Sequence, residues 1–312
     1  MTTAIAIRTL HKDFGDIQAV QGVNIAIQAG EVYSLLGPNG AGKTTTISIL
    51  CGLLQPTDGD IVVNGESVVR KPQAVKAMIG LVPQQIAIYP NMSARENLRF
   101  WGRMYGLNGK LLHSRVDEVL DLVGLADRAK GATKKFSGGM QRRLNIAIAL
   151  LHHPQIVIMD EPTVGIDPQS RRAILDGIKA LNREGMTVLY TTHYMEEAQE
   201  LSHRIGIMDH GKLIAEGSHD ELVKIVGEYD RIDLALNTAA DAVCEAWRDI
   251  PDVHQLTAEE DRVELLVEDS NEALPLLFET ATAHGSRITS VAIQEPNLEA
   301  VFLHLTGRAL RD

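Results

Sequence analysis

The sequence predicts an α/β protein whose main domain holds a parallel β-sheet covered by helices, followed by a small α+β domain. Three observations predict this architecture. Apolar runs such as QIVIMD and MTVLYTTH alternate with helical segments after residue 150. Such alternation is typical of a parallel sheet with helices on its faces. The composition changes near Gly227, and 312 residues suffice for two domains, which we expect at 1–226 and 227–312.

The first half of the main domain begins with strands and continues with helices. Short strands are expected at 4–9, 22–28 and 31–36. The segment 56–65 resembles a strand pair, because Asp58-Gly59 and Asn64-Gly65 are both turn signals. From Ser93 to Leu150 the pattern becomes helical. Past Leu150, two apolar runs bounded by turn signals predict buried strands, and amphipathic helices follow each of them.

The last 86 residues predict a separate small domain. Its first six elements have the order βαββαβ, which suggests a ferredoxin-like sandwich. The expected elements are strand 230–236, helix 239–249, strands 253–257 and 262–268, helix 271–284, strand 287–293 and helix 297–306.

Charge and cysteine content exclude several classes of function. Residues 227–312 contain 18 acidic and 6 basic side chains, so nearly all of the net charge of −11 belongs to the tail. A tail this acidic would be repelled by nucleic acid, and we expect no nucleic-acid partner. The two cysteines, Cys51 and Cys244, lie far apart, and their spacing predicts neither a disulfide framework nor a metal site.

The sequence contains no stretch of roughly 20 apolar residues that could span a membrane. The N-terminal segment reaches a charged residue too early for the apolar core of a secretory signal. The expected location is therefore the cytoplasm, unless a partner holds the chain at a membrane.

A glycine-rich loop predicts a nucleotide site. GPNGAGKTT follows the strand EVYSLL, precedes a helix and fits the pattern G-x-x-x-x-G-K-[ST]. Its glycines allow successive N–H groups to face one phosphate cluster, and the helix N-terminus adds positive charge. The lysine would reach the β- and γ-phosphates, while Thr44 would complete the coordination of Mg²⁺. The expected nucleotide-binding residues are Gly37, Pro38, Asn39, Gly40, Ala41, Gly42, Lys43, Thr44 and Thr45.

Two acidic residues end the buried strand IVIMD. Asp160 would lie at the carboxyl end of the strand, where open α/β sheets bind ligands, and Mg²⁺ would supply the cation that a buried carboxylate needs. Glu161 follows directly and is expected to act as the general base that polarises the attacking water.

The segment FSGGMQRR narrows the class, because it resembles the LSGGQ signature of the ATP-binding-cassette (ABC) family. Ser137, Gly138 and Gly139 open a helix there and form a second anion-binding N-terminus. The resemblance implies that this end serves the nucleotide held by a second subunit. A dimer of ATP-binding subunits around two MgATP is therefore expected.

Three further matches follow in the family's order. Gln84 resembles the loop glutamine that touches Mg²⁺ and water, Asp167 resembles the loop that crosses the dimer interface, and His193 resembles the switch histidine on the γ-phosphate. Together with Lys43 and Glu161, Gln84 and His193 form the expected catalytic set. The resemblance covers about residues 3–226. It implies a RecA-like core, an antiparallel β subdomain and a helical subdomain at about 86–150.

The adenine contact is less distinctive. Phe14 occupies the position where the family stacks an aromatic ring on adenine, and Val20 could pack beside it. Phe14 could instead belong to the core. Nothing in this set would strongly reject GTP.

The resemblance also implies an integral membrane permease as partner. Four of the 13 aromatic residues lie between Tyr89 and Tyr105, so we expect the permease to dock near residues 84–105, although these side chains could equally form the core of the helical subdomain. The chain would then lie on the inner face of the cell membrane. The ending EPNLEAVFLHLTGRAL resembles the C-terminal domain of daunorubicin-resistance-type ATPases, which predicts export of drugs, antibiotics or lipids.

Two alternatives remain at this point. Sugar importers also carry C-terminal domains, but these are usually barrel-like and rich in strands. Soluble cassette proteins usually join two cassettes or insert a long coiled coil, and this sequence has neither feature. The sequence identifies neither the cargo nor whether the dimer is homomeric.

Overall fold

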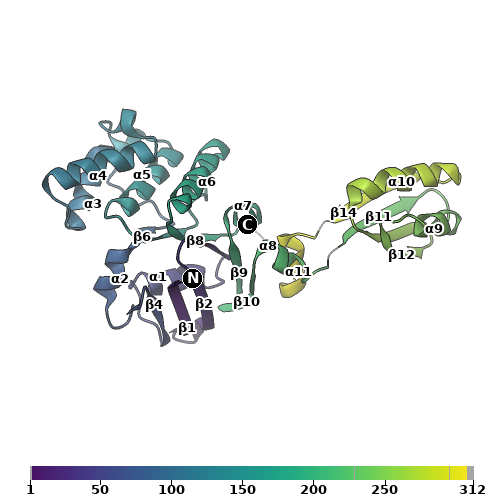
Figure 1. The fold of residues 1–312 in the computed structure, drawn as a ribbon, viewed down its shortest axis with the longest axis horizontal. Coiled ribbons are helices and arrows are strands. Elements are labelled where there is room, and N and C mark those ends of the chain that lie inside the picture. The colour runs from purple at the N-terminus through teal and green to yellow at the C-terminus, as the bar shows by residue number, and fades with distance from the viewer. Residues whose placement is uncertain (1, 228, 295, 308–312) are drawn as a thin grey trace. The chain divides into compact units, whose positions relative to one another are not determined.

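The computed structural model describes residues 2–227, 229–294 and 296–307. The packing of the chain forms two compact units, one ending at His219 and the other beginning at Asp220. The first unit contains the sheet, the phosphate loop and the helical region, and the second contains the acidic tail domain (Figure 1).

A six-stranded sheet of order β10-β9-β3-β8-β7-β6 forms the centre of the first unit. Its first five strands in chain order are parallel, and β10 pairs antiparallel at one edge. The strands are β3 (Val32–Leu36), β6 (Ile79–Val82), β7 (Ile156–Asp160), β8 (Thr187–Thr192), β9 (Arg204–Asp209) and β10 (Lys212–Gly217). Every residue of β3, β7 and β8 is buried, because both faces of the sheet are covered.

Alternation along these strands creates two cores. Ile156 and Ile158 face the core that contains the antiparallel sheet, whereas Val157 and Met159 face the core that contains the helical region. Successive side chains of a strand point to opposite faces, so one apolar run serves both cores. The helices of this α/β part are α1 (Lys43–Leu50), α2 (Pro72–Met78), α6 (Pro168–Arg183) and α7 (Met195–Leu201), whereas α8 (His219–Val223) begins at the boundary between the two units.

A four-stranded antiparallel sheet of order β2-β1-β4-β5 lies beside this core. Its strands are β1 (Thr3–Phe14), β2 (Ile17–Gln28), β4 (Asp58–Val63) and β5 (Glu66–Ser67). The hairpin strands are longer than the sequence predicts, with 12 residues each, because Gly15 and Asp16 form the turn and bulges interrupt the apolar alternation.

One turn prediction in this sheet is wrong. Asn64-Gly65 does form a turn, with both residues at positive φ. Asp58-Gly59 instead begins β4, and a Cβ on Gly59 would lie 2.3 Å from the carbonyl oxygen of Thr9. The glycine is thus needed for close approach to a bulge in β1, not for a chain reversal.

The helical region between β6 and β7 contains α3 (Ala94–Met104), α4 (Gly109–Leu122) and α5 (Gly138–Leu150), with short 3₁₀ turns at Ala126–Arg128 and Thr133–Lys135. Ser93 and Glu96 form a capping box that fixes the start of α3. Ser137 caps α5 by accepting a hydrogen bond from Met140 N. The predicted change from strands to helices is therefore confirmed.

The second unit confirms the ferredoxin-like prediction. Its sheet has the order β12-β13-β11-β14, so the first strand in chain order lies between the third and the fourth. Alternate residues of β11 and β13 are buried, and they pack with Trp247 and Leu277 in a separate core. The elements are β11 (Asp230–Leu236), α9 (Asp241–Arg248), β12 (Val253–Glu259), β13 (Arg262–Val267), α10 (Ser270–Ala283), β14 (Ile288–Gln294) and α11 (Leu298–Thr306).

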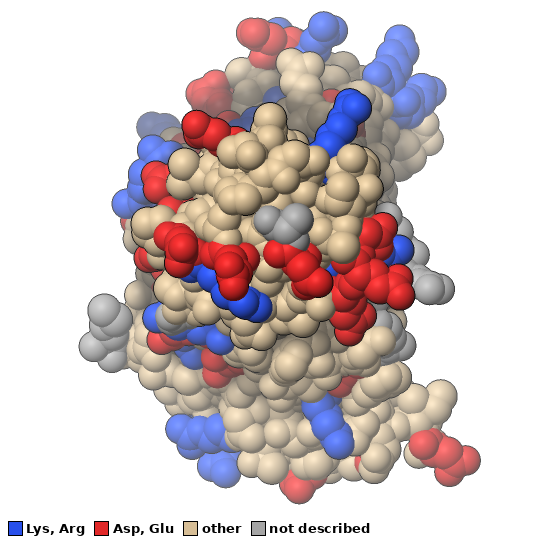
Figure 2. Space-filling view, turned by 90° about the vertical axis from the view of Figure 1, so that its right-hand side faces the viewer, with Lys and Arg blue, Asp and Glu red and all other residues tan. Residues whose placement is uncertain are grey.

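The acidic character of the tail is visible on its surface. Figure 2 shows acidic side chains in a band across the face that is turned towards the viewer, which belongs to the second unit. Four residues of the ending EPNLEAVFLHLTGRAL, namely Glu295, Arg308, Ala309 and Leu310, lie outside the described residues, as do Arg311 and Asp312. No helix in the described part of the chain is long and apolar enough to cross a membrane.

Candidate nucleotide site

The phosphate loop joins β3 to α1 in a shape that only glycine permits at two positions. Gly40 and Gly42 have φ values of +82° and +103°. A Cβ on Gly42 would also lie 2.6 Å from the carbonyl oxygen of Ala19. These glycines curl the loop over the first turn of α1, whose free N–H groups form an anion-binding end.

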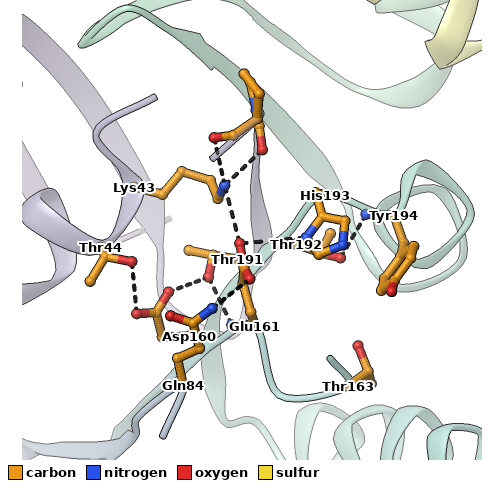
Figure 3. A network of polar contacts seen from close by, with 12 residues as sticks. Lys43, Thr44, Gln84, Asp160, Glu161, Thr163, Thr191, Thr192, His193 and Tyr194 are labelled. Carbon is orange, nitrogen blue, oxygen red and sulfur yellow. Dashed lines mark hydrogen bonds and ion pairs between the residues drawn. The ribbon is translucent and has the colours of Figure 1, made fainter. Parts of the chain in front are cut away.

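Lys43 lies at the first position of α1 and is buried under this loop. Its ammonium group donates to the carbonyl oxygens of Gly37 at 2.7 Å and Pro38 at 3.1 Å, and it pairs with Glu161 at 3.2 Å (Figure 3). The two charged side chains are only 4% and 5% exposed. A buried charge is tolerated when it is paired and hydrogen-bonded, so each side chain stabilises the other.

Asp160 ends β7 directly below the loop. Its two carboxylate oxygens accept hydrogen bonds from Thr44 Oγ1 at 3.0 Å and from Thr191 Oγ1 at 2.7 Å. Thr191 belongs to the neighbouring strand β8, so two parallel strands and the start of α1 hold this carboxylate (Figure 3). The carboxyl edge of the sheet therefore presents hydroxyl and carboxylate oxygens together.

Glu161 is held in a strained backbone conformation beside Asp160. Its φ is +45°, which is uncommon outside glycine, and its N–H donates to Thr191 Oγ1 at 3.0 Å. Gln84 Nε2 donates to one carboxylate oxygen at 3.0 Å, and His193 Nδ1 lies 3.5 Å from the other (Figure 3). Lys43, Gln84 and His193 thus surround the carboxylate of Glu161, so the structure brings the four expected catalytic residues together.

A pocket of about 440 Å³ extends from the loop towards the hairpin β1–β2. Phe14 lines it and is 47% exposed, so its ring is available for stacking and does not belong to the core. The pocket is also lined by all the expected loop residues from Pro38 to Thr45, whereas Gly37 lies behind them.

The prediction for Val20 needs correction. Val20 is fully buried in the core and is not on the pocket wall, because it lies on the inward-facing side of β2. Ile17, which the sequence analysis did not identify, is 69% exposed and lines the pocket opposite the loop. Strand alternation could have found it, since Ile17 and Val20 are an odd number of residues apart.

The second predicted anion-binding end lies elsewhere in the unit. Ser137 and Gly138 are exposed, and neither they nor Asp167 line the pocket described above. Gly139 is buried, and a Cβ there would lie 2.0 Å from Ser170 Oγ. The start of α5 thus packs closely against the first turn of α6.

Asp167 caps α6 at this same point. Its carboxylate accepts a hydrogen bond from Ser170 N at 2.9 Å. The hydrogen bonds from Ser170 hold the pKa of Asp167 below its usual value. The side chain is therefore a charged, exposed group next to the signature glycines.

Arg142 on α5 is a structural link that the sequence analysis missed. Its guanidinium donates to the carbonyl oxygens of Pro83 and Gln84, each at 2.6 Å, and its side chain is buried. Asn145, one turn later, accepts a hydrogen bond from Ala87 N at 3.2 Å. Burial lowers the pKa of Arg142. Arg142 and Asn145 of α5 therefore hold the loop that carries Gln84. The only sign of this contact in the sequence was the presence of polar residues in the otherwise apolar run RRLNIAIAL.

An ATP-hydrolysing cassette is the class that this fold and site define. The sequence matches the family described as "ABC transporter" over residues 20–164, and the domain described as "ATP-binding protein DrrA1-3-like, C-terminal domain" over residues 228–306. The chain belongs to the ABC transporter ATP-binding subunits, in the group that carries this C-terminal domain.

Relatives similar over nearly the whole chain support this membership. The linearmycin resistance ATP-binding protein LnrL of Bacillus subtilis is 47% identical, covering 97% of this chain and 98% of the relative. The daunorubicin resistance ATP-binding protein DrrA3 of Streptomyces coeruleorubidus is 40% identical, covering 98% and 96%. The Nod factor export ATP-binding protein I of Cupriavidus metallidurans is 38% identical over the full length of both.

Solved structures share the fold of the first unit. The ATP-binding cassette MJ0796, solved as a dimer bound to ADP and Pi, gives a TM-score of 0.63 at 28% identity, covering 69% of this chain and 98% of that one. An ATP-binding subunit of an ABC transporter gives a TM-score of 0.65 at 28% identity, covering 72% and 93%. The chain is thus the ATPase subunit of an ABC exporter, a class whose members dimerise and work with a membrane permease.

Proposed function

We propose that two copies of this chain face each other and enclose two MgATP, each held by the phosphate loop of one copy and the signature segment of the other. Exposure of Ser137 and Gly138 at the start of α5 supports this arrangement, since a helix N-terminus that faces outward can bind an anion held by another molecule. The dimeric cassette MJ0796 gives a precedent for the pairing.

The nucleotide contacts follow from the pocket. The loop residues Pro38 to Thr45 would surround the phosphates, and Phe14 would stack on the base with Ile17 beside it. Stacking contributes about 1 kcal/mol and uses only the ring face, so base selectivity is expected to be weak.

The residues at the carboxyl edge of the sheet fit a magnesium ion. Thr44 and Asp160 present hydroxyl and carboxylate oxygens 3.0 Å apart, and Gln84 adds an amide oxygen nearby. Magnesium favours oxygen ligands and usually takes one or two carboxylates together with substrate phosphates. Among the described residues there is no group of three or more His, Cys, Asp or Glu that could hold a metal, which fits an ion that depends on the nucleotide. When bound, the ion would neutralise charge on the phosphate oxygens.

The Lys43–Glu161 ion pair supports the assignment of the general base. A triphosphate on the loop would compete for the Lys43 ammonium group, which lies 3.2 Å from the Glu161 carboxylate. Glu161 would then be free to accept a proton from water, while Gln84 and His193 hold the reacting groups in position. Lys43 and His193 would stabilise charge on the transferring phosphoryl group.

Glu161→Gln tests this assignment. Removing a general base lowers the rate of hydrolysis by about 100-fold or more, while ATP binding should persist and a closed dimer should accumulate. Steady-state hydrolysis and size-exclusion chromatography with ATP measure both effects. Glu196→Gln, an exposed glutamate on α7, is the matched control. Hydrolysis by Glu161→Gln at the wild-type rate would contradict the proposal.

The permease is proposed to dock near residues 84–105. Tyr89 packs edge-on against Phe100 at 4.8 Å, and 43% of its surface remains exposed, whereas Trp101 packs on the core of the unit. The Gln84 loop leads directly into this aromatic surface, which suits transmission from nucleotide to permease. Tyr89→Arg should weaken co-purification with the permease, and Leu53→Arg, at an exposed position of the first unit outside residues 84–105, serves as control.

Export of drugs, antibiotics or lipids is the proposed transport function, with the chain held by the permease on the cytoplasmic face of the cell membrane. The names of three relatives, which concern linearmycin resistance, daunorubicin resistance and Nod factor export, support export and argue against the import alternative. The acidic C-terminal unit is proposed to clasp its counterpart and set the dimer geometry. Deleting residues 227–312 should therefore weaken assembly, and unchanged assembly would contradict this role.

A further inference from the structure

A buried carboxylate lies beside the nucleotide site without belonging to it. Glu197 on α7 is 3% exposed. Its Oε2 accepts hydrogen bonds from Thr163 Oγ1 at 2.9 Å, Tyr190 OH at 2.7 Å and Thr192 Oγ1 at 2.9 Å. Removing a carboxylate from water is costly unless hydrogen bonds and a cation compensate. The three donors to one oxygen of Glu197 supply much of this compensation.

The donors come from the two segments that carry the proposed catalytic groups. Thr163 follows Glu161 by two residues, and Thr192 directly precedes His193 (Figure 3). The Thr192 hydroxyl also accepts a hydrogen bond from Tyr194 N at 2.9 Å, which fixes the chain on the far side of His193. One carboxylate oxygen therefore joins the segment that follows β7 to the end of β8.

The other oxygen of Glu197 faces a third segment. Arg171 Nε of α6 lies 3.6 Å from Oε1. The Arg171 guanidinium also lies over the ring of Tyr194 at 4.5 Å, and Tyr194 packs on the His193 ring at 4.2 Å. Arg171 lies in the first turns of α6, which begins after its cap Asp167. Its contact with Tyr194 therefore connects the start of α6 to His193.

The tyrosine in this cluster remains a hydrogen-bond donor. Burial and the nearby Glu197 charge hold the pKa of Tyr190 well above its usual value. Tyr190 therefore stays protonated at neutral pH and keeps its hydrogen bond to Oε2.

We propose that Glu197 is a positioning residue that fixes the spacing between Glu161 and His193 and couples both to α6. It touches neither group, and it acts through Thr163, Thr192 and Arg171. This inference rests on the proposed roles of Glu161 and His193. A γ-phosphate and its attacking water need both groups in register, and misplacement by 1 Å can cost about 100-fold in rate.

The first test compares Glu197→Gln with Glu196→Gln, the same change on the same helix at an exposed position. We expect kcat for ATP hydrolysis to fall about 10-fold to 100-fold in Glu197→Gln, with KM and the affinity for ADP unchanged. Glu196→Gln should match the wild type. A kcat for Glu197→Gln equal to that of the control overturns the proposal.

The second test avoids a change to the buried charge. Thr192→Val removes the hydroxyl at constant shape, whereas Thr192→Ser keeps it. Thr192→Val should lower kcat and Thr192→Ser should retain it, with the affinity for ADP unchanged in both variants. If Glu197→Gln fails to fold, this pair decides: equal kcat values for the two variants would overturn the proposal.

A double-mutant cycle tests the link to α6. If Arg171 acts through Glu197, combining Arg171→Met with Glu197→Gln should reduce kcat no further than Glu197→Gln alone. Additive losses would overturn the link. Glu161→Gln, measured in the same assay, separates this proposal from the assignment of the general base. If that variant hydrolyses ATP at the wild-type rate, Glu161 is not the base, regardless of the result for Glu197.

Discussion

The first unit contains two helix N-termini suited to anions, and they are built in opposite ways. At α1, the glycine-rich loop curls over Lys43, whose charge is buried and paired with Glu161. At α5, Ser137 and Gly138 face solvent, and only Gly139 is buried, against Ser170. The first end is a pocket with its own counter-charge, whereas the second is an open surface. This difference is the one expected if the second end binds a ligand held by another molecule, as we propose.

The largest expected effect concerns the charge at the first end. Lys43→Ala leaves Glu161 buried without its ammonium partner, and breaking a buried ion pair costs about 3–5 kcal/mol. Chemical denaturation should show a loss of this size in the free energy of unfolding, and hydrolysis should fall to background. Adding Glu161→Gln should restore most of the stability but no activity. If Lys43→Ala is as stable as the wild type, the ion pair with Glu161 does not stabilise the start of α1, and the contrast with the open start of α5 is contradicted.

Ser137→Ala should separate pairing from binding. Losing a helix cap costs about 1 kcal/mol, and losing one donor to the transferring phosphoryl group costs about 100-fold in rate. The isolated chain should keep its affinity for ATP, but the ATP-dependent dimer should disappear in size-exclusion chromatography. Ser93→Ala at the cap of α3 is the matched control, with a similar loss of stability and normal pairing. A loss of ATP affinity in isolated Ser137→Ala would place both ends at one molecule's site.

The two signature glycines, Gly138 and Gly139, should respond differently to replacement by alanine. A Cβ on Gly139 would lie 2.0 Å from Ser170 Oγ, so Gly139→Ala should destabilise the fold by about 1–3 kcal/mol. A Cβ on Gly138 would meet nothing closer than Ile166 Cδ1 at 3.7 Å. Gly138→Ala should therefore keep the unfolding midpoint in urea but weaken the ATP-dependent dimer. Equal loss of stability in the two variants would contradict this division.

The smallest expected effect is a pH dependence at Asp167. Its pKa in the folded protein lies below the ordinary value, so its stabilising hydrogen bonds to Ser170 are present above about pH 4 and are lost as the pH falls through the folded pKa. Asp167→Ala should be less stable than the wild type at neutral pH, and the gap should narrow in acid. Thermal unfolding at several pH values measures this. If the difference in stability between Asp167→Ala and the wild type stays constant down to pH 2, it arises from packing and not from the charge of Asp167.

Much of the fold followed from local patterns. The fully buried runs of β7 and β8 and the helical pattern from Ser93 to Leu150 lie as predicted, because period and burial are encoded in neighbouring residues. The strands β9 and β10 were not predicted. RIGIMD follows the helix α7 without a clear boundary, and KLIAEG is an edge strand whose residues do not alternate between buried and exposed. Likewise, the inward position of Val20 depends on the register of β2 and not on its residue type.

Contiguous segments of the sequence were enough to predict the phosphate loop, the carboxylate pair at a strand end, the signature segment and the acidic tail domain. Each is contiguous, so its residue types and spacing suffice to indicate it. Only the tertiary structure decided that Lys43 pairs with Glu161, that Arg142 grips the Gln84 loop and that Glu197 joins the ends of β7 and β8. These contacts link residues up to 118 positions apart, because sheet order and burial, rather than chain neighbours, bring their side chains together.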